Sequence, residues 1–129
     1  MDNKPFQVRT FDIGDKTTKK TLVLVHGYTG ASVMFYQMLY TLSQQYRIVM
    51  FDHGSWGMNT RLKECSGYES QEAADWWIQE WITKVFEKLD LPQKFLLCGH
   101  SLGGWMCSLY ASMFPDRVDG LFLISPAGV

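Results

Sequence analysis

The sequence predicts a three-layer α/β fold with a mostly parallel sheet, and two observations carry this prediction. Short, continuous apolar segments alternate with longer segments in which apolar residues recur every three or four positions. The short segments are typical of strands buried on both faces of a parallel sheet, and the longer ones of amphipathic helices. Strands that alternate with helices imply right-handed crossovers, which place helices on the faces of the sheet. With 129 residues, the chain is long enough for one domain with a buried core.

The short apolar segments are the predicted strands. They are rich in branched aliphatic and aromatic residues and cover Thr21–Val25, Tyr46–Phe51, Lys94–Cys98 and Leu121–Ile124. A further strand is expected within Phe6–Ile13, ahead of the first of these segments.

Three helices are predicted between the strands. The clearest pattern puts one apolar face on Ala74, Trp77, Ile78, Trp81, Ile82, Val85 and Leu89. This helix should end near Asp90, because Pro92 cannot continue it. A second helix is expected from about Leu102 to Phe114, where Pro115 follows, and a third covers roughly Ser32–Gln44.

The composition limits the classes of function. Twelve basic and 13 acidic residues give a net charge of −1, and without a dense basic run we expect no nucleic-acid partner. The longest apolar runs have the length of strands, so no transmembrane segment is expected, and the first residues lack the pattern of a signal peptide. Cys65, Cys98 and Cys107 lack the spacing of a metal or redox site. We therefore expect neither metal nor cofactor, and an intracellular, reducing compartment.

The segment Phe95–Gly104 carries the chemistry. A predicted strand leads into a Gly-x-Ser-x-Gly turn, and a predicted helix follows at once. This is the setting of a nucleophile elbow, which makes Ser101 the candidate covalent nucleophile. Gly99 and Gly103 should crowd together across such a turn and must lack side chains, and Gly104 would let the helix begin close to the sheet. The alternative is a tight turn in which the serine is merely structural.

A second glycine-containing turn follows the strand that ends at Val25. Ligands of such sheets bind beyond the carboxyl ends of the strands, so this turn should face Ser101. His26-Gly27-Tyr28 can aim a backbone amide at the reacting carbonyl oxygen. The amides of Tyr28 and Leu102 are the predicted oxyanion donors. The His26 side chain itself is expected to be structural, hydrogen-bonded within its loop.

The loops that follow the other strands are expected at the same edge of the sheet. Asp52 and His53 can be interpreted as a triad acid and base, or as part of a loop whose aspartate caps local amides. We favour capping, because adjacent residues cannot both join the required chain of hydrogen bonds to Ser101. His100 is not expected to be the base either, since neighbouring side chains diverge on a tight turn. Ser125-Pro126 completes the set of loops.

On these residues the chain resembles the N-terminal half of an α/β-hydrolase fold protein, and residues 1–129 would form the first half of such a domain. The resembling segments are the oxyanion loop at His26-Gly27, the Asp-x-x-Gly-x-Gly loop at Asp52–Gly57, the elbow at Gly99–Gly104, the helix end at Tyr110 and Phe114–Val118, and the strand before the lid at Leu123–Gly128. The elbow helix and the Ser-Pro-Ala-Gly ending are most similar to lysophospholipase and acyltransferase-like members, which act on phospholipids.

The resemblance implies ester cleavage through an acyl-serine, with a small-molecule or lipid ester as substrate. Ser101 would attack the ester, two amides would hold the oxyanion, and a histidine would move the proton. In this family the acid and the histidine follow the serine in the chain. After Ser101 this sequence holds only the acids Asp116 and Asp119 and no histidine. The triad acid and histidine, the lid and the last strands are therefore expected outside this chain, which alone should be inactive.

Two interpretations stay open. The first is an incomplete serine hydrolase, and the second is a non-catalytic α/β-hydrolase-like accessory subunit of a larger assembly. The intact elbow favours the first, because nothing structural requires a serine at its tip. Under the second, an exposed sheet edge and uncovered apolar surface would require a protein partner that completes the sheet.

Overall fold

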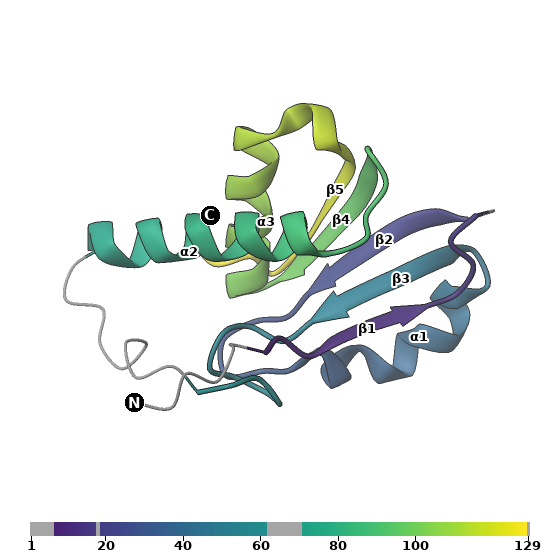
Figure 1. The fold of residues 1–129 in the computed structure, drawn as a ribbon, viewed down its shortest axis with the longest axis horizontal. Coiled ribbons are helices and arrows are strands. Elements are labelled where there is room, and N and C mark those ends of the chain that lie inside the picture. The colour runs from purple at the N-terminus through teal and green to yellow at the C-terminus, as the bar shows by residue number, and fades with distance from the viewer. Residues whose placement is uncertain (1–6, 18, 62–70, 129) are drawn as a thin grey trace.

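The computed structural model describes residues 7–17, 19–61 and 71–128, and of residues 71–78 the backbone alone. The described strands form one five-stranded sheet in the order β1-β3-β2-β4-β5 (Figure 1). Their bounds are Thr10–Ile13 for β1, Lys20–Val25 for β2, Tyr46–Phe51 for β3, Phe95–His100 for β4 and Val118–Ile124 for β5. β1 runs antiparallel to β3, and the other neighbours are parallel. The predicted, mostly parallel sheet is confirmed.

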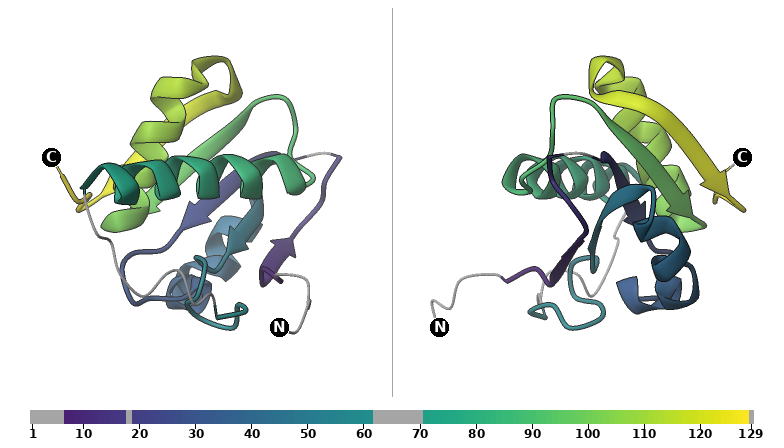
Figure 2. Two further views of the ribbon diagram at one scale, coloured as in Figure 1. Left: turned by 60° about the vertical axis from the view of Figure 1, so that its left-hand side comes forward. Right: turned by 90° about the vertical axis from the view of Figure 1, so that its right-hand side faces the viewer.

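Helices cover both faces of this sheet, which gives the predicted three layers (Figure 2). The helices are α1 at Tyr36–Ser43, α2 at Gln71–Lys88 and α3 at Leu102–Met113, with short 3-10 helices η1 at Ser32–Phe35 and η3 at Pro115–Arg117. One core lies under α2 and α3, where Ile82 and Met106 pack with Phe51. A smaller core lies under α1, where Leu39 packs against a cluster that contains Leu24 and Met50.

The element bounds differ from the predicted ones at the first strand and at the first helix. The first strand is limited to Thr10–Ile13, a short edge strand whose one partner among the described strands is β3. The helix predicted at Ser32–Gln44 is divided into η1 and α1, in keeping with the frequent 3-10 turns at helix starts. The helix that ends before Pro115 does so as expected, and Pro115 itself opens η3.

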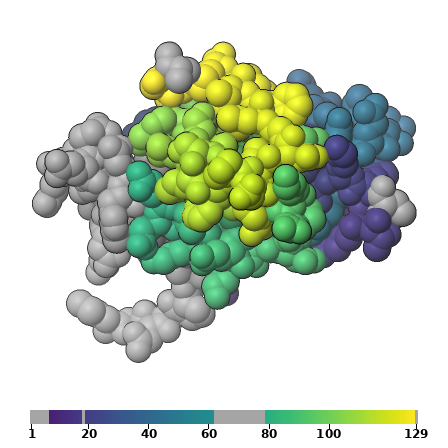
Figure 3. All heavy atoms as spheres, turned by 90° about the horizontal axis from the view of Figure 1, so that it is seen from above, coloured from purple at the N-terminus to yellow at the C-terminus, as the bar shows by residue number. Residues whose placement is uncertain are grey.

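The expectation that β5 is buried on both faces is wrong. Leu121, Phe122, Leu123 and Ile124 are 37–54% exposed. The reason is position: β5 is the edge strand beside β4, and no described strand pairs with its outer side. Figure 3 shows this segment (yellow) at the surface next to α3.

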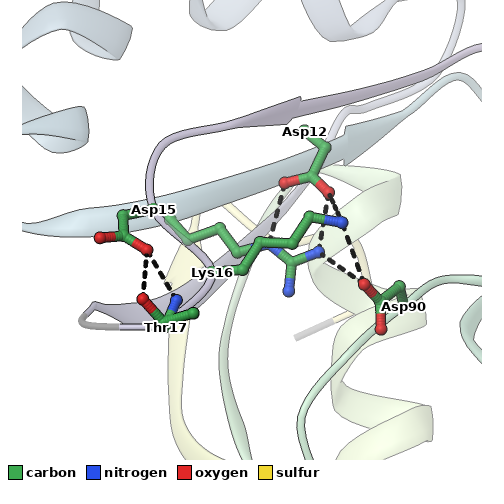
Figure 4. Close-up of polar contacts among 6 residues, drawn as sticks. Asp12, Asp15, Lys16, Thr17 and Asp90 are labelled. Atoms are coloured by element: carbon green, nitrogen blue, oxygen red, sulfur yellow. Dashed lines mark hydrogen bonds and ion pairs between the residues drawn. The ribbon is translucent and has the colours of Figure 1, made fainter.

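A cluster of charged side chains lies at the end of the sheet where β3 begins (Figure 4). The Arg47 guanidinium, 4% exposed, donates to both carboxylate oxygens of Asp12, at 2.8 and 2.7 Å. Lys16 Nζ lies 3.1 Å from Asp12 Oδ2 and 3.0 Å from Asp90 Oδ2. The hydrogen bond from Arg47 lowers the pKa of Asp12 more than any other contact does. The cluster thus joins β1, β3 and the loop after α2.

Candidate active site

Ser101 occupies a strained turn between β4 and α3. Its φ of 53° and ψ of −119° lie in a sparsely populated region for a residue with a side chain. The turn is held by the loop after β5: Ser101 N–H donates to Ile124 O at 3.0 Å, and Ala127 N–H donates to Ser101 O at 2.9 Å. The helix α3 begins directly after Ser101, so its amino end, with the positive end of its dipole, lies beside the serine.

The glycines around Ser101 are required by close backbone contacts. A Cβ at Gly99 would overlap the carbonyl oxygen of Gly103, and a Cβ at Gly103 would overlap the carbonyl of Val25 at the end of β2. Gly103 therefore lets the start of α3 approach β2. A Cβ at Gly104 would lie 2.7 Å from the Cβ of Pro126, so this glycine admits the loop after β5.

The turn after β2, residues 26–30, lies directly against Ser101, and we refer to it as the oxyanion loop, after the role that the sequence predicts for it. A Cβ at Gly27 would lie 2.9 Å from Ser101 Cβ and 3.0 Å from His100 Nδ1. Within the described parts of the chain, no group accepts a hydrogen bond from the amide of Tyr28 or of Leu102. Unpaired amides are what an oxyanion needs. The arrangement is consistent with Tyr28 and Leu102 as donors, and that pairing stays a prediction.

His26 and His53 form a buried, reciprocal pair behind the oxyanion loop. His53 N–H donates to His26 Nε2 at 2.9 Å, and His53 Nε2 lies 2.6 Å from His26 O. His26 Nδ1 lies 2.8 Å from Gly27 O. Both side chains are at most 2% exposed. Burial lowers the pKa of His26, and burial together with the nearby His26 ring lowers the pKa of His53 to about 3. Both rings are therefore neutral, and both form hydrogen bonds with backbone groups of the loops.

Asp52 caps backbone amides, the arrangement that we favoured from the sequence. Its carboxylate accepts Ser32 N–H at 2.7 Å and Met58 N–H at 3.0 Å. Burial alone would raise the pKa of Asp52, but the hydrogen bonds from Met58 and Ser32 outweigh it, and the pKa lies below its ordinary value. A carboxylate engaged in this way holds η1 and the loop after β3 together. It makes no hydrogen bond to Ser101 or to either buried histidine.

Two features of the loop after β3 were not anticipated from the sequence. Asn59, 6% exposed, donates to Asp52 O and His53 O at 2.5 and 2.9 Å, and its Oδ1 accepts Arg9 N–H. Ser55 stands where the Asp-x-x-Gly-x-Gly pattern has its first glycine, and its φ is 66°. That glycine in the pattern could have signalled the positive φ, whereas nothing local signalled Asn59.

The two acids that follow Ser101 lie at the opposite end of the sheet. Asp116 is exposed in η3, and Asp119, near the start of β5, pairs with Lys20 at 3.0 Å. Neither is near the elbow, because β5 runs parallel to β4 and Ser101 follows the far end of β4. Among the described residues, no group of three or more His, Cys, Asp or Glu could hold a metal ion. No described helix has the length and apolar character needed to cross a membrane.

Comparisons with known proteins agree with this geometry. The family model of the α/β-hydrolase fold matches residues 20–128. A probable 1-acylglycerol-3-phosphate O-acyltransferase of Oryza sativa subsp. japonica is 32% identical over 127 residues, which are 98% of this chain and 30% of that protein. The human (lyso)-N-acylphosphatidylethanolamine lipase is 30% identical over 117 residues, which are 88% of this chain and 32% of that protein.

A solved structure extends the comparison to three dimensions. The carboxylesterase CesB of Bacillus subtilis superposes with a TM-score of 0.74 and 28% identity, over 93% of this chain and 39% of that protein. The chain thus spans about a third of the length of the curated relatives it matches. From the family match and the strand–elbow–helix arrangement together, this chain belongs to the α/β-hydrolase fold family.

Proposed function

We propose that this chain supplies the nucleophile and the oxyanion donors of a serine hydrolase or acyltransferase that acts on a lipid ester. The observation that carries this proposal is the strained backbone of Ser101 at the amino end of α3, with the oxyanion loop packed against its Cβ. A backbone strained at a functional turn is characteristic of a residue whose side chain must be presented for chemistry.

The proposed reaction begins with attack of Ser101 Oγ on the ester carbonyl carbon. The hydroxyl proton passes to a base, the carbonyl oxygen becomes an oxyanion, and the amides of Tyr28 and Leu102 donate to it. Collapse breaks the ester C–O bond, the alcohol leaves with the proton, and the acyl group stays on Ser101. Water, or the hydroxyl of an acceptor lipid, then attacks the acyl carbon and releases Ser101 by the reverse steps.

The base and its acid are proposed to come from outside this sequence. His26 and His53 are occupied behind the oxyanion loop, and Asp52 caps amides. His100 is not expected to act as the base, because the side chains of neighbouring residues diverge on a tight turn. The 129-residue chain by itself should therefore show negligible turnover.

A lipid substrate is supported by the relatives and by the surface beside the elbow. The rice and human relatives are described as an acyltransferase and a lipase for phospholipid-related molecules. In this chain, Tyr28 and Met58 are 67% and 69% exposed, and Met34, 44% exposed, lies against the oxyanion loop near Gly30. Exposed apolar side chains near a nucleophile suit a substrate with an acyl chain.

A second candidate function is that of a non-catalytic accessory subunit that completes its sheet with a protein partner. The exposed apolar edge at β5 favours it. The two candidates differ in what a substitution of Ser101 does, because an accessory role would not depend on that hydroxyl.

We also propose a reducing, intracellular compartment for the protein. Cys98 and Cys107 are both buried free thiols, and burial raises the pKa of each. Buried thiols of this kind act as small apolar core residues.

The test of the proposed function is fatty-acid release and acyl transfer by the protein that its complete gene encodes. Lysophospholipids are offered in mixed micelles, with wild type, Ser101→Ala and Ser112→Ala compared. Ser112 is an exposed serine on the same helix and serves as the matched control. We expect Ser101→Ala to lose about 10⁴-fold or more in rate, and Ser112→Ala to match wild type. Equal activity of wild type and Ser101→Ala would refute the catalytic role and favour the accessory one.

A further inference from the structure

We propose that His53 is a positioning residue for catalysis, which fixes the direction of the Tyr28 amide by holding His26. This inference rests on the proposed function, because it gives the oxyanion loop the role of donor. It concerns a residue outside the elbow, on the loop after β3.

The hydrogen bonds assign one tautomer to each histidine. His26 Nε2 accepts the His53 amide, so the ring proton of His26 must sit on Nδ1, which donates to Gly27 O. His53 Nε2 lies 2.6 Å from His26 O, so it must carry the proton and donate it. His53 Nδ1 is buried and accepts no hydrogen bond from the described residues. Backbone and ring of His53 thus bind His26 at two points.

These bonds determine where the Tyr28 amide points. Gly27 C=O and Tyr28 N–H belong to one planar, trans peptide unit, so they point in opposite directions. Gly27 O accepts from His26 Nδ1 and, at 3.2 Å, from Gly30 N–H. With this carbonyl held on the side of His26, the Tyr28 N–H must leave on the opposite side. His53 therefore acts on the Tyr28 amide through the ring and the carbonyl of His26.

Packing alone does not account for a histidine at this place. The ring of His53 meets Phe51 edge-on, with centroids 5.9 Å apart, and Trp56 likewise at 5.6 Å. A phenylalanine would satisfy these apolar neighbours, but it would leave His26 O buried without its donor. An unpaired buried carbonyl is energetically unfavourable, and the loop can relieve this by rotating the peptide unit. A glutamine places an amide N–H near the former Nε2 and can keep the donor.

The experiment compares wild type, His53→Phe and His53→Gln in the protein that the complete gene encodes. The readouts are kcat and KM on a p-nitrophenyl ester and the rate constant of labelling by a fluorophosphonate. We expect His53→Phe to lower kcat and the labelling rate by about 100-fold, the effect of a displacement of roughly 1 Å, with KM unchanged. His53→Gln should recover most of the lost rate. Unchanged kcat in His53→Phe, or no recovery in His53→Gln, would overturn the proposal.

A second measurement holds even if His53→Phe does not fold or if Ser101 proves not to be catalytic. Nitrogen-15 NMR of the wild-type histidines reports which ring nitrogen carries the proton. We expect Nδ1–H for His26 and Nε2–H for His53, both neutral, and the opposite tautomer of either would overturn the proposed contacts. If the wild-type protein shows these tautomers but does not react at Ser101, the proposed function and the catalytic role of His53 are both wrong. The hydrogen bonds between the two histidines would still be supported. The expected tautomers with a normal rate in His53→Phe would reject the positioning role alone.

Discussion

Positive φ angles at residues with side chains gather at one edge of this molecule. Among the described residues they occur at Thr29, Ser55, Ser101 and Ser125, each in the loop that follows a parallel strand. Such angles cost free energy and persist where the surrounding structure enforces them. The strained residues therefore lie beyond the carboxyl ends of the parallel strands, at the same end of the sheet as the elbow.

At Thr29 this strain should be measurable. Thr29 is exposed and β-branched, and its φ is 54°. Thr29→Gly should raise the free energy of unfolding by roughly 0.5–1 kcal/mol, since glycine adopts this angle freely but loses more entropy on folding. Chemical denaturation gives the value. Thr41→Gly, at an exposed position of α1, is the matched control and should lower the stability by about 0.5 kcal/mol. Destabilisation by Thr29→Gly would contradict the strain.

The buried His53 makes stability depend on pH. Its pKa is about 3 in the folded protein, against an ordinary value of 6.5. Below pH 6.5 the unfolded chain therefore binds a proton at His53, whereas the folded chain does not. As the pH falls from 6.5 to about 3, the free energy of unfolding decreases by up to about 1.4 kcal/mol per pH unit. Above pH 6.5 this group contributes no pH dependence. Denaturation curves at pH 7, 5.5 and 4 give the free energy of unfolding at each pH, and this free energy should change less with pH in His53→Gln than in wild type. An equal change with pH in both proteins would contradict the burial of a neutral ring.

The residues at the elbow were largely predictable from the sequence, and the contacts behind it were not. Gly99 and Gly103 follow from one steric requirement, the close approach of backbone segments across the turn, which a short segment of sequence encodes. The pairing of His26 with His53 joins residues that are 27 positions apart, and Asn59 depends on the path of its loop. No local pattern encodes either contact, because both depend on how separate loops meet at the edge of the sheet.

At the scale of elements, strand positions followed from the sequence and burial did not always do so. The apolar run Leu121–Ile124 marks a strand correctly, as part of β5. Whether its two faces are covered depends on neighbours that the run itself does not specify. The same reasoning applies to α1, whose place on the sheet face opposite α2 and α3 could not be derived from its own residues.

The ion pair that joins β1 to β3 should be asymmetric in its effect on stability. Arg47 is 4% exposed and Asp12 is 34% exposed. Asp12→Ala removes the two hydrogen bonds of the buried Arg47 guanidinium, leaves it with the exposed Asp90 carboxylate at 3.8 Å, and should cost about 3 kcal/mol of unfolding free energy. Arg47→Met leaves the Asp12 carboxylate paired with Lys16 and hydrated by water, and should lower the free energy of unfolding by only about 1 kcal/mol. Thermal and urea denaturation of both variants provide the comparison.

A surface ion pair provides the control for this comparison. Lys84→Ala removes an exposed partner of Glu80 on α2 and should change stability by less than about 0.5 kcal/mol.

The double variant Asp12→Ala/Arg47→Met should be more stable than Asp12→Ala alone. A larger loss for Arg47→Met than for Asp12→Ala would contradict the importance of the buried charge.

At the scale of the whole molecule, α1 leaves part of one sheet face uncovered. A groove of about 490 Å³ lies between α1 and the β4–β5 edge, with Met38, Leu42, Leu96 and Phe122 among its lining. Exposed apolar strands at a sheet edge promote association.

We expect the 129-residue chain expressed by itself to self-associate as its concentration rises. Phe122, 54% exposed on the edge strand, is the residue to change, because Phe122→Lys places a charge on that edge and should reduce association. Light scattering coupled to gel filtration measures this. Tyr40→Lys, at a position on α1 that is 79% exposed and outside the groove, should associate as wild type does. A monomeric wild type at all concentrations would contradict the role of this edge.

The nucleophilic role of Ser101 is tested most directly by mapping where a fluorophosphonate attaches to the native protein. Trypsin should release a peptide from Phe95 to Arg117, which contains Ser101, Ser108 and Ser112. Fragmentation of the labelled peptide distinguishes these serines. We predict a single adduct, on Ser101. An adduct on another residue, or an unlabelled Ser101 in a protein that cleaves esters, would contradict the assignment of the nucleophile.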